Sequence, residues 1–157
     1  MTNNTENTSF ESEGLTREVV QVSPELVTEV IFALNNHDKE QLDFLLEPLH
    51  SADVADIFEQ LDDSDRKELA SFIGAELEPD VLSELDDSTL DDVITEMDDE
   101  DVARAITQME SDDAVHVLED LDEDDQRKII DALPAEDRLA VEEGLSFPED
   151  SAGRLLQ

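Results

Sequence analysis

The spacing of apolar residues constrains this chain more than any other feature. Nine apolar positions follow one another at intervals of twelve without a slip: Leu49, Leu61, Ile73, Leu85, Met97, Met109, Leu121, Leu133 and Leu145. Four residues before each of the last eight stands a second apolar column: Ile57, Leu69, Val81, Val93, Ala105, Val117, Ile129 and Val141. Between the two columns, most repeats carry a third apolar residue: Phe58, Leu82, Ile94, Ile106, Leu118 and Ile130. Because positions i, i+1 and i+4 share one face of an α-helix, the pattern predicts one short helix per repeat.

Helices this short need neighbours. A helix of about 8 to 10 residues is only about 12 to 15 Å long, and it does not persist alone in water. A repeat with one element per unit buries its apolar stripe against the units before and after it, as in a solenoid. No stretch alternates with period two over enough length to form a strand. We therefore expect an all-α fold in which short helices stack into a superhelix.

Polar residues before each apolar stripe predict where the helices begin. Ser, Thr, Asp and Asn are preferred as N-caps because their side chains accept hydrogen bonds from the first free backbone amides. We expect N-caps at six positions in the repeats: Ser51, Ser64, Ser88, Asp99, Ser111 and Asp124. Pro79 fits the first turn of a helix, and Pro134 follows a helix end.

Two further helices are expected before the repeats. The first has Ser23 as its cap and Pro24 at its first position, and the second has Asp38 and Gln41 in capping-box positions. We expect this pair to cap the superhelix at its N-terminal end. Residues 1–22 lack the repeat and are expected to form a disordered tail.

The charge of the chain restricts its partners. Forty-six acidic residues against nine basic ones give a formal charge of −37, so the phosphates of nucleic acid would be repelled. Cations and basic surfaces are the expected partners. Because the sequence has no cysteine, it offers no disulfide and no thiolate metal ligand, which suits a cytoplasmic protein. No apolar run reaches the roughly 18 residues that span a bilayer, and the N-terminus has no secretory-signal pattern, so we expect a soluble, unexported chain.

A calcium loop is the most specific alternative for the acidic clusters. Asp120, Asp122 and Asp124 have the alternating spacing with which an EF-hand begins. The sixth position should be Gly for the tight turn but is Asp125, and the twelfth should be Glu but is Asp131. These departures exclude an EF-hand loop.

Catalysis has no support in the residue pattern. The three histidines are isolated, and neither a zinc-protease motif nor a nucleophile elbow occurs. Acids are everywhere, so no pair of carboxylates is marked out for glycoside hydrolysis, and no Trp or Tyr is present to stack on a sugar. We do not expect an enzyme.

The excess of acids leaves two interpretations open. Acids in the first helical turn interact favourably with the helix dipole, which explains one or two per repeat but not "DDED" at 98–101 or "DEDD" at 122–125. A solvated surface, as in proteins from salt-rich habitats, needs no binding site. The alternative is a collective surface that attracts cations. Mg²⁺ suits such a surface because it takes oxygen ligands, keeps several waters and often uses only one or two carboxylates.

The repeat and the segment that follows it resemble a known family. The sequence "FPEDSAGRLLQ" at 147–157 matches the segment that follows the cytosolic N-terminal domain of MgtE-family magnesium channels and transporters, except that Leu156 stands where Met is usual. The resemblance covers residues 24–157. It divides the chain into a tail (1–22), an MgtE N-type domain (23–146) and a linker toward CBS domains (147–157). The chain stops where the CBS pair would begin, so we expect a piece of a longer transporter.

The resemblance implies both a fold and a role. The fold is a right-handed superhelix of about ten short helices. The role is that of a Mg²⁺-sensing regulatory domain on the cytoplasmic side of the cell membrane. Mg²⁺ held between this domain and the CBS domains of a homodimeric transporter would favour the closed pore. Alone, the domain would bind Mg²⁺ weakly and would not insert into the membrane. The alternative is a scaffold for protein contacts with no metal role, akin to the flagellar motor-switch middle domain.

The resemblance also implies ligand positions. Asp80 in "EPDVLSEL" stands where the family has an acidic Mg²⁺ ligand, with Asp in place of the more familiar Glu. Asp112 in "SDDAVHVL" matches a second ligand position, and Asp113 is its neighbour. His116 stands where a relative has an acid one turn further on, and imidazole is a poor Mg²⁺ ligand. The metal site is therefore expected at Asp80, Asp112 and Asp113, in altered form.

Overall fold

The computed structural model describes residues 22–147. The predicted tail and linker fall outside this range, apart from Val22 and Phe147. The described residues form ten α-helices and one 3₁₀ turn, η1 (Gly74–Glu76), with no strand among them. In chain order the helices are α1 (Pro24–Asn35), α2 (Lys39–Leu46), α3 (Ser51–Gln60), α4 (Asp63–Ile73), α5 (Pro79–Glu84), α6 (Asp87–Glu96), α7 (Asp99–Gln108), α8 (Ser111–Glu119), α9 (Glu123–Ala132) and α10 (Ala135–Ser146). The all-α prediction is confirmed.

Each regular repeat consists of ten helical residues and two extended ones. Helices α3, α6, α7 and α9 each have 10 residues. Between α3 and α4 the only connection is Leu61 (φ −76°, ψ 150°) followed by Asp62 (φ −71°, ψ 168°). The first residue ends one helix and the second begins the next. Such a short connection leaves no room for a loop, so it explains why the spacing never slips.

The six predicted N-caps in the repeats are wrong by one or two residues. The residues at these cap positions are His50, Asp62, Asp86, Asp98, Glu110 and Asp122. Among them, the Asp62 carboxylate accepts from the Asp65 amide at 2.9 Å, and Asp86 accepts from the Thr89 amide at 2.8 Å. The predicted caps lie later in the sequence because the prediction assumed a longer turn between one helix and the next. At Asp62, Asp86, Asp98 and Glu110 the preceding apolar residue is already extended, so the cap follows it directly.

The other predicted helix starts are confirmed. The Leu26 amide donates to Ser23 Oγ at 3.2 Å, with Pro24 in the first turn of α1. The Gln41 amide donates to Asp38 Oδ1 at 3.0 Å at the start of α2. Both helices begin where their polar residue and the helical periodicity agree.

The apolar columns form the core. All eight residues of the second column are at most 6% exposed. In the first column, six of the nine residues are buried, and Leu49, Met109 and Leu145 are partly buried against the core. Thr89 is the one buried polar residue in residues 22–147. The core is therefore aliphatic apart from Phe58, which is fully buried, and it runs along the whole stack.

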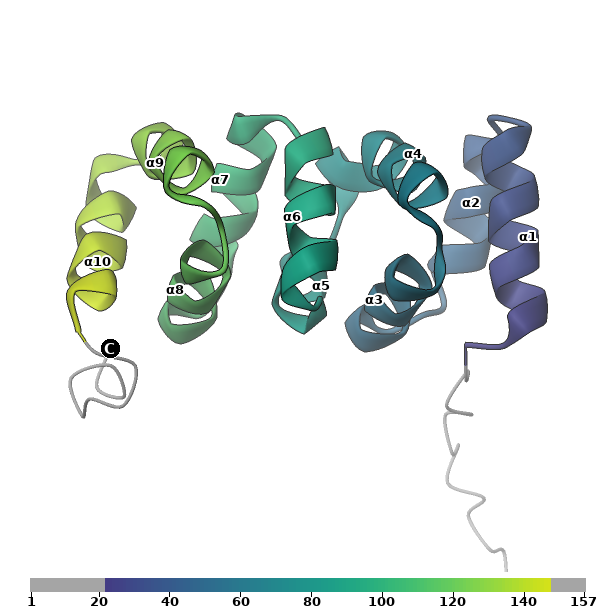
Figure 1. The fold of residues 1–157 in the computed structure, drawn as a ribbon, viewed down its shortest axis with the longest axis horizontal. Helices are drawn as coiled ribbons and strands as arrows, with labels where there is room; N and C mark the ends of the chain where they lie inside the picture. The colour runs from purple at the N-terminus through teal and green to yellow at the C-terminus, as the bar shows by residue number, and fades with distance from the viewer. Residues whose placement is uncertain (1–21, 148–157) are drawn as a thin grey trace, which may run out of the picture.

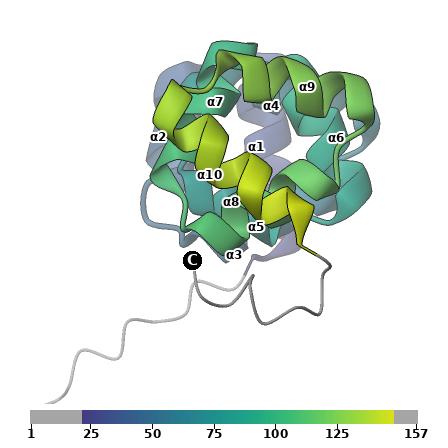
Figure 2. The same cartoon turned by 90° about the vertical axis from the view of Figure 1, so that its left-hand side faces the viewer.

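The helices stack along one axis from α1 at one end to α10 at the other (Figure 1). Seen along that axis they lie around a common interior (Figure 2). Helices pack chiefly against the second helix along the chain: α3 on α5, α4 on α6, α7 on α9 and α8 on α10. Helix α1 packs on α2 and α4, so the N-terminal pair closes one end of the stack. This arrangement fits the expected superhelix, whose right-handed sense stays a prediction.

The repeat is interrupted once, after Ile73. In the regular spacing a helix would begin near residue 75, which would place Pro79 in its interior. Proline has no amide hydrogen and its ring clashes with the preceding turn, so a helix excludes it there. The chain instead makes the turn η1, and the helix restarts with Pro79 in its first turn. Helix α5 is consequently only six residues long.

Arg66 ties three helices together. Its side chain is 11% exposed. It donates from Nε to the carbonyl of Phe58 at 3.0 Å and from Nη2 to the carbonyl of Leu61 at 3.1 Å. Its Nη1 donates to Asp92 Oδ2 on α6 at 2.7 Å. The last carbonyls of a helix have no partner within the helix, so Arg66 on α4 supplies donors to the end of α3.

Two further residues at the same position of the twelve-residue repeat, Gln126 and Arg138, also donate to the end of the preceding helix. Gln126 Nε2 donates to the carbonyl of Leu118 at 2.8 Å, and Arg138 Nε donates to the carbonyl of Ile130 at 3.1 Å. In each case the acceptor lies eight residues before the donor. A polar side chain at this position therefore satisfies the end of the preceding helix.

Candidate metal centre

One group of close carboxylates lies at the start of α8. Glu110 is the N-cap residue (φ −65°, ψ 151°), and Asp112 and Asp113 occupy the first turn. Each offers a carboxylate oxygen, and the three oxygens lie within 4.8 Å of one another. The Glu110 side chain makes no capping hydrogen bond. The two-residue connection before α8 thus brings three acids together at one helix end.

The donor set of this group fits a hard divalent cation. All three ligands are oxygens, as Mg²⁺ and Ca²⁺ require, and three carboxylates would supply part of a shell that water completes. Glu110 and Asp112 are exposed and Asp113 is half-buried, so water reaches the group. The positive end of the α8 dipole opposes a bound cation. The geometry therefore favours a weak, partly hydrated site.

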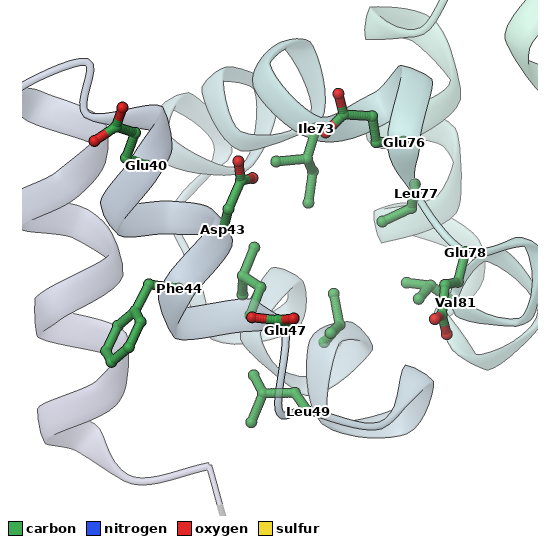
Figure 3. Close-up of a pocket in the computed structure, with 12 residues that line it drawn as sticks. Glu40, Asp43, Phe44, Glu47, Leu49, Ile73, Glu76, Leu77, Glu78 and Val81 are labelled. Carbon is green, nitrogen blue, oxygen red and sulfur yellow. The ribbon is translucent and has the colours of Figure 1, made fainter.

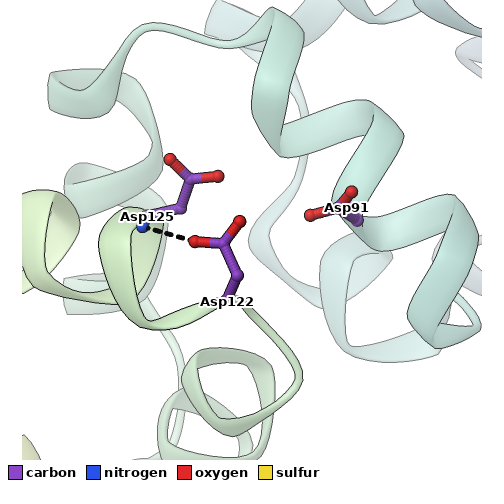
Figure 4. Close-up of side chains that lie close together, drawn as sticks. All are labelled: Asp91, Asp122 and Asp125. Atoms are coloured by element: carbon purple, nitrogen blue, oxygen red, sulfur yellow. Dashed lines mark hydrogen bonds between the residues drawn. The ribbon is translucent and has the colours of Figure 1, made fainter.

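A second group joins two helices. Asp91 on α6 lies near Asp122 and Asp125 at the start of α9, again with oxygens within 4.8 Å (Figure 4). Two of these carboxylates already accept hydrogen bonds. Asp122 Oδ1 accepts from the Asp125 amide at 2.8 Å, and Asp125 Oδ1 accepts from Lys128 Nζ at 2.6 Å. The bond with Asp125 raises the pKa of the Lys128 ammonium, which keeps it charged beside the group. A cation would have to compete with Lys128 here.

The structure brings together two of the three predicted ligands. Asp112 and Asp113 share the α8 group, whose third member, Glu110, was not predicted. Glu110 could have been found in the sequence from its position directly after Met109, where the next helix begins. Asp80 is exposed in the first turn of α5 and belongs to neither close carboxylate group of the described residues. Helix α5 does pack on α8, so Asp80 stays a predicted ligand on an adjacent helix.

His116 lies on α8, and its imidazole faces the carboxylate of Asp120, the C-cap residue of that helix. Its side chain is 63% exposed, and Nε2 is 3.6 Å from Asp120 Oδ2.

No helix of residues 22–147 is both long and apolar enough to cross a membrane. The fold and these carboxylates together define an acidic all-α repeat domain that offers oxygen ligands at helix starts.

The family of the chain follows from comparison with known proteins. The family model of the MgtE intracellular N domain matches residues 49–150. This span begins at the first residue of the twelve-residue repeat and includes α3 to α10. The chain belongs to the MgtE intracellular N domain family.

A solved structure has the same fold. It is described as the crystal structure of the soluble part of a magnesium transporter, and it superposes with a TM-score of 0.70 at 23% sequence identity. The match covers 83% of this chain and 52% of that one. The chain therefore corresponds to about half of the protein in that structure. No curated protein sequence matches this chain.

Proposed function

We propose that this domain is the Mg²⁺-sensing regulatory part of a magnesium channel or transporter. The group Glu110, Asp112 and Asp113 carries the proposal, because three carboxylate oxygens within 4.8 Å are what a hard divalent cation binds. Membership of the MgtE N domain family supports a role for magnesium. The partners in this proposal are CBS domains of the same homodimeric transporter, on the cytoplasmic side of the membrane.

Charge repulsion supplies the mechanism of the proposed switch. The chain carries a formal charge of −37, so an acidic partner domain is repelled when no cation lies between the two. A divalent cation shared by carboxylates of both domains removes that repulsion and draws them together. A ligand shifts an equilibrium only by its difference in affinity between two states. The closed arrangement, which completes the ligand shell, is the one that Mg²⁺ would stabilise.

Thermal unfolding with added Mg²⁺ tests the cation site in this domain. Circular dichroism would follow unfolding during a MgCl₂ titration, with NaCl at matched ionic strength as the control. We expect Mg²⁺ to raise the melting temperature more than NaCl does. Asp112→Asn should remove the excess, and Glu142→Gln on α10 should leave it. Equal effects of the two salts would mean that screening alone acts.

Paramagnetic Mn²⁺ locates the site. Mn²⁺ prefers the same oxygen ligands as Mg²⁺ and broadens nearby amide signals. We expect the amides around residues 110–113 to broaden first, and Mg²⁺ to reverse the effect. Uniform broadening over all acidic helix starts would favour the alternative, a scaffold that uses the helical stack for protein contacts without a metal role.

A further inference from the structure

A groove opens where the repeat is interrupted (Figure 3). It has a volume of about 700 Å³ and lies between α2, the start of α3, η1 and the start of α5. Along this stretch η1 and the six-residue α5 stand where a regular repeat has one ten-residue helix. The groove therefore lies at the interruption of the repeat.

The floor of the groove is apolar. Val54, Ile73 and Val81 are buried beneath it, and Leu49 and Leu77 are half-buried in its wall. Phe44 on α2 stands at its edge with 71% of its surface exposed.

The apolar surface continues past Phe44. A second hollow of about 520 Å³, lined by Leu26, Leu45 and Pro48, shares Phe44, Glu47 and Leu49 with the groove. An exposed aromatic ring between two apolar hollows is the kind of feature that anchors a protein partner.

The rim of the groove is acidic. Five exposed carboxylates line it: Glu40, Asp43, Glu47, Glu76 and Glu78. Lys39 pairs with Glu76, Nζ to Oε1 at 2.9 Å, and the bond raises the pKa of the lysine. No lysine or arginine lines the groove itself. The rim therefore keeps a strongly negative potential above an apolar floor.

We propose that this groove is a docking site for a basic amphipathic helix of a partner protein. Such a helix places its apolar face on the floor and around Phe44, while its Lys and Arg side chains meet the rim carboxylates. Charge complementarity selects this occupant over a second copy, because two chains of charge −37 repel each other. The site shares no residue with the Glu110 group, so it stands apart from the proposed Mg²⁺ role.

Fluorescence anisotropy tests the proposal with a labelled synthetic peptide, a helix with leucines on one face and lysines on the other. Two control peptides replace either the leucines by serine or the lysines by glutamate. At physiological salt we expect the first peptide to bind and both controls to bind at least about tenfold more weakly. Equal affinity for the serine peptide would mean non-specific attraction and would overturn the proposal.

Matched variants of the full chain locate the binding surface. Phe44→Ala should weaken peptide binding by about tenfold or more. Phe32→Ala should leave it unchanged, because Phe32 is 70% exposed but lies outside both hollows. The pair Asp43→Asn and Glu47→Gln should reduce both the affinity and its salt dependence. All of these side chains are exposed, so the variants should melt like the wild type.

Two results would assign the surface otherwise. Equal effects of Phe44→Ala and Phe32→Ala would mean that the groove is not the binding site. Sedimentation showing a dimer that Phe44→Ala dissociates would assign the face to a second copy. Asp112→Asn should not change peptide affinity, so failure of the Mg²⁺ proposal and failure of this one are distinguishable.

Discussion

Replacing Arg66 by methionine should destabilise the domain by about 3 kcal/mol. The substitution keeps an unbranched side chain of good helix propensity but removes all donors. The carbonyls of Phe58 and Leu61 lose their side-chain partner, and Asp92 loses its bond of 2.7 Å. A buried polar group left without a partner costs about 1–3 kcal/mol. The low end of that range applies to each of the three acceptors, because Asp92 is 25% exposed and keeps its ion pair with Lys67 Nζ at 3.8 Å, and because water reaches part of the site.

Urea unfolding followed by far-UV circular dichroism measures this loss. The chain has no Trp or Tyr, so intrinsic fluorescence is not a practical probe. Arg127→Met is the matched control: it makes the same chemical change at an exposed position of α9 and should stay within about 0.5 kcal/mol of the wild type. The stability of Arg66→Gln should lie between that of Arg66→Met and that of the wild type. Gln126, at the same repeat position, shows that a glutamine can make one hydrogen bond to the end of the preceding helix.

The reasoning fails if Arg66→Met and Arg127→Met unfold at the same urea concentration with the same slope. That outcome would mean that water satisfies the end of α3 as well as Arg66 does. A changed slope would instead indicate that unfolding is no longer two-state, and the free energies could then not be compared.

Three further predictions concern packing, pH and salt. Gly74→Ala should lower the free energy of unfolding by about 1–2 kcal/mol, because the added Cβ would lie 2.8 Å from Met97 Cγ. The backbone at Gly74 (φ −53°) suits alanine, so the loss would come from this contact. In a double-mutant cycle, Met97→Ala should relieve much of the loss. The amide of Thr89 lowers the pKa of Asp86, so the carboxylate stabilises the fold above its unfolded pKa. Asp86→Ala should therefore cost about 1 kcal/mol at neutral pH, and a pH series of urea curves should show the loss shrinking as pH falls through the folded pKa. Raising NaCl from about 0.1 M to 1 M shortens the screening length from about 10 to 3 Å, so the melting temperature should rise; a constant or falling value would contradict self-repulsion as a destabilising force.

The helices and the core were predictable because one period determines both. A residue of the second column, such as Ile57, lies on the buried face of its helix, and the first-column residue four positions on, Leu61, enters the same core from the extended connection just after the helix. The place of Pro79 in the first turn of a helix was also predictable, because proline is excluded from later turns. The exact helix starts were not, because both Asp62 and Ser64 are good caps by residue type. Only the extended backbone at Leu61 decides between them.

The candidate site was predictable only in its local part. Asp112 and Asp113 are neighbours in sequence, and any helix start there would place them together. Asp91 joins Asp122 because α6 and α9 lie near each other in the stack, and no spacing within a repeat encodes that proximity. The groove proposed for docking likewise depends on how α2 packs beside η1 and the start of α5, which the presence of Pro79 alone does not specify.

The packing of most helices against near neighbours along the chain also affects how the domain folds during synthesis. Ribosomes add about 5 to 20 residues per second, so two repeats take about one to five seconds. Helix formation takes about a microsecond, and local contacts favour fast folding. Each short helix can therefore become stable as soon as its partner helix has been synthesised, so α3 can pack on α5 while α10 is still untranslated. The domain can fold progressively from its N-terminal end, without an intermediate in which distant segments must find each other.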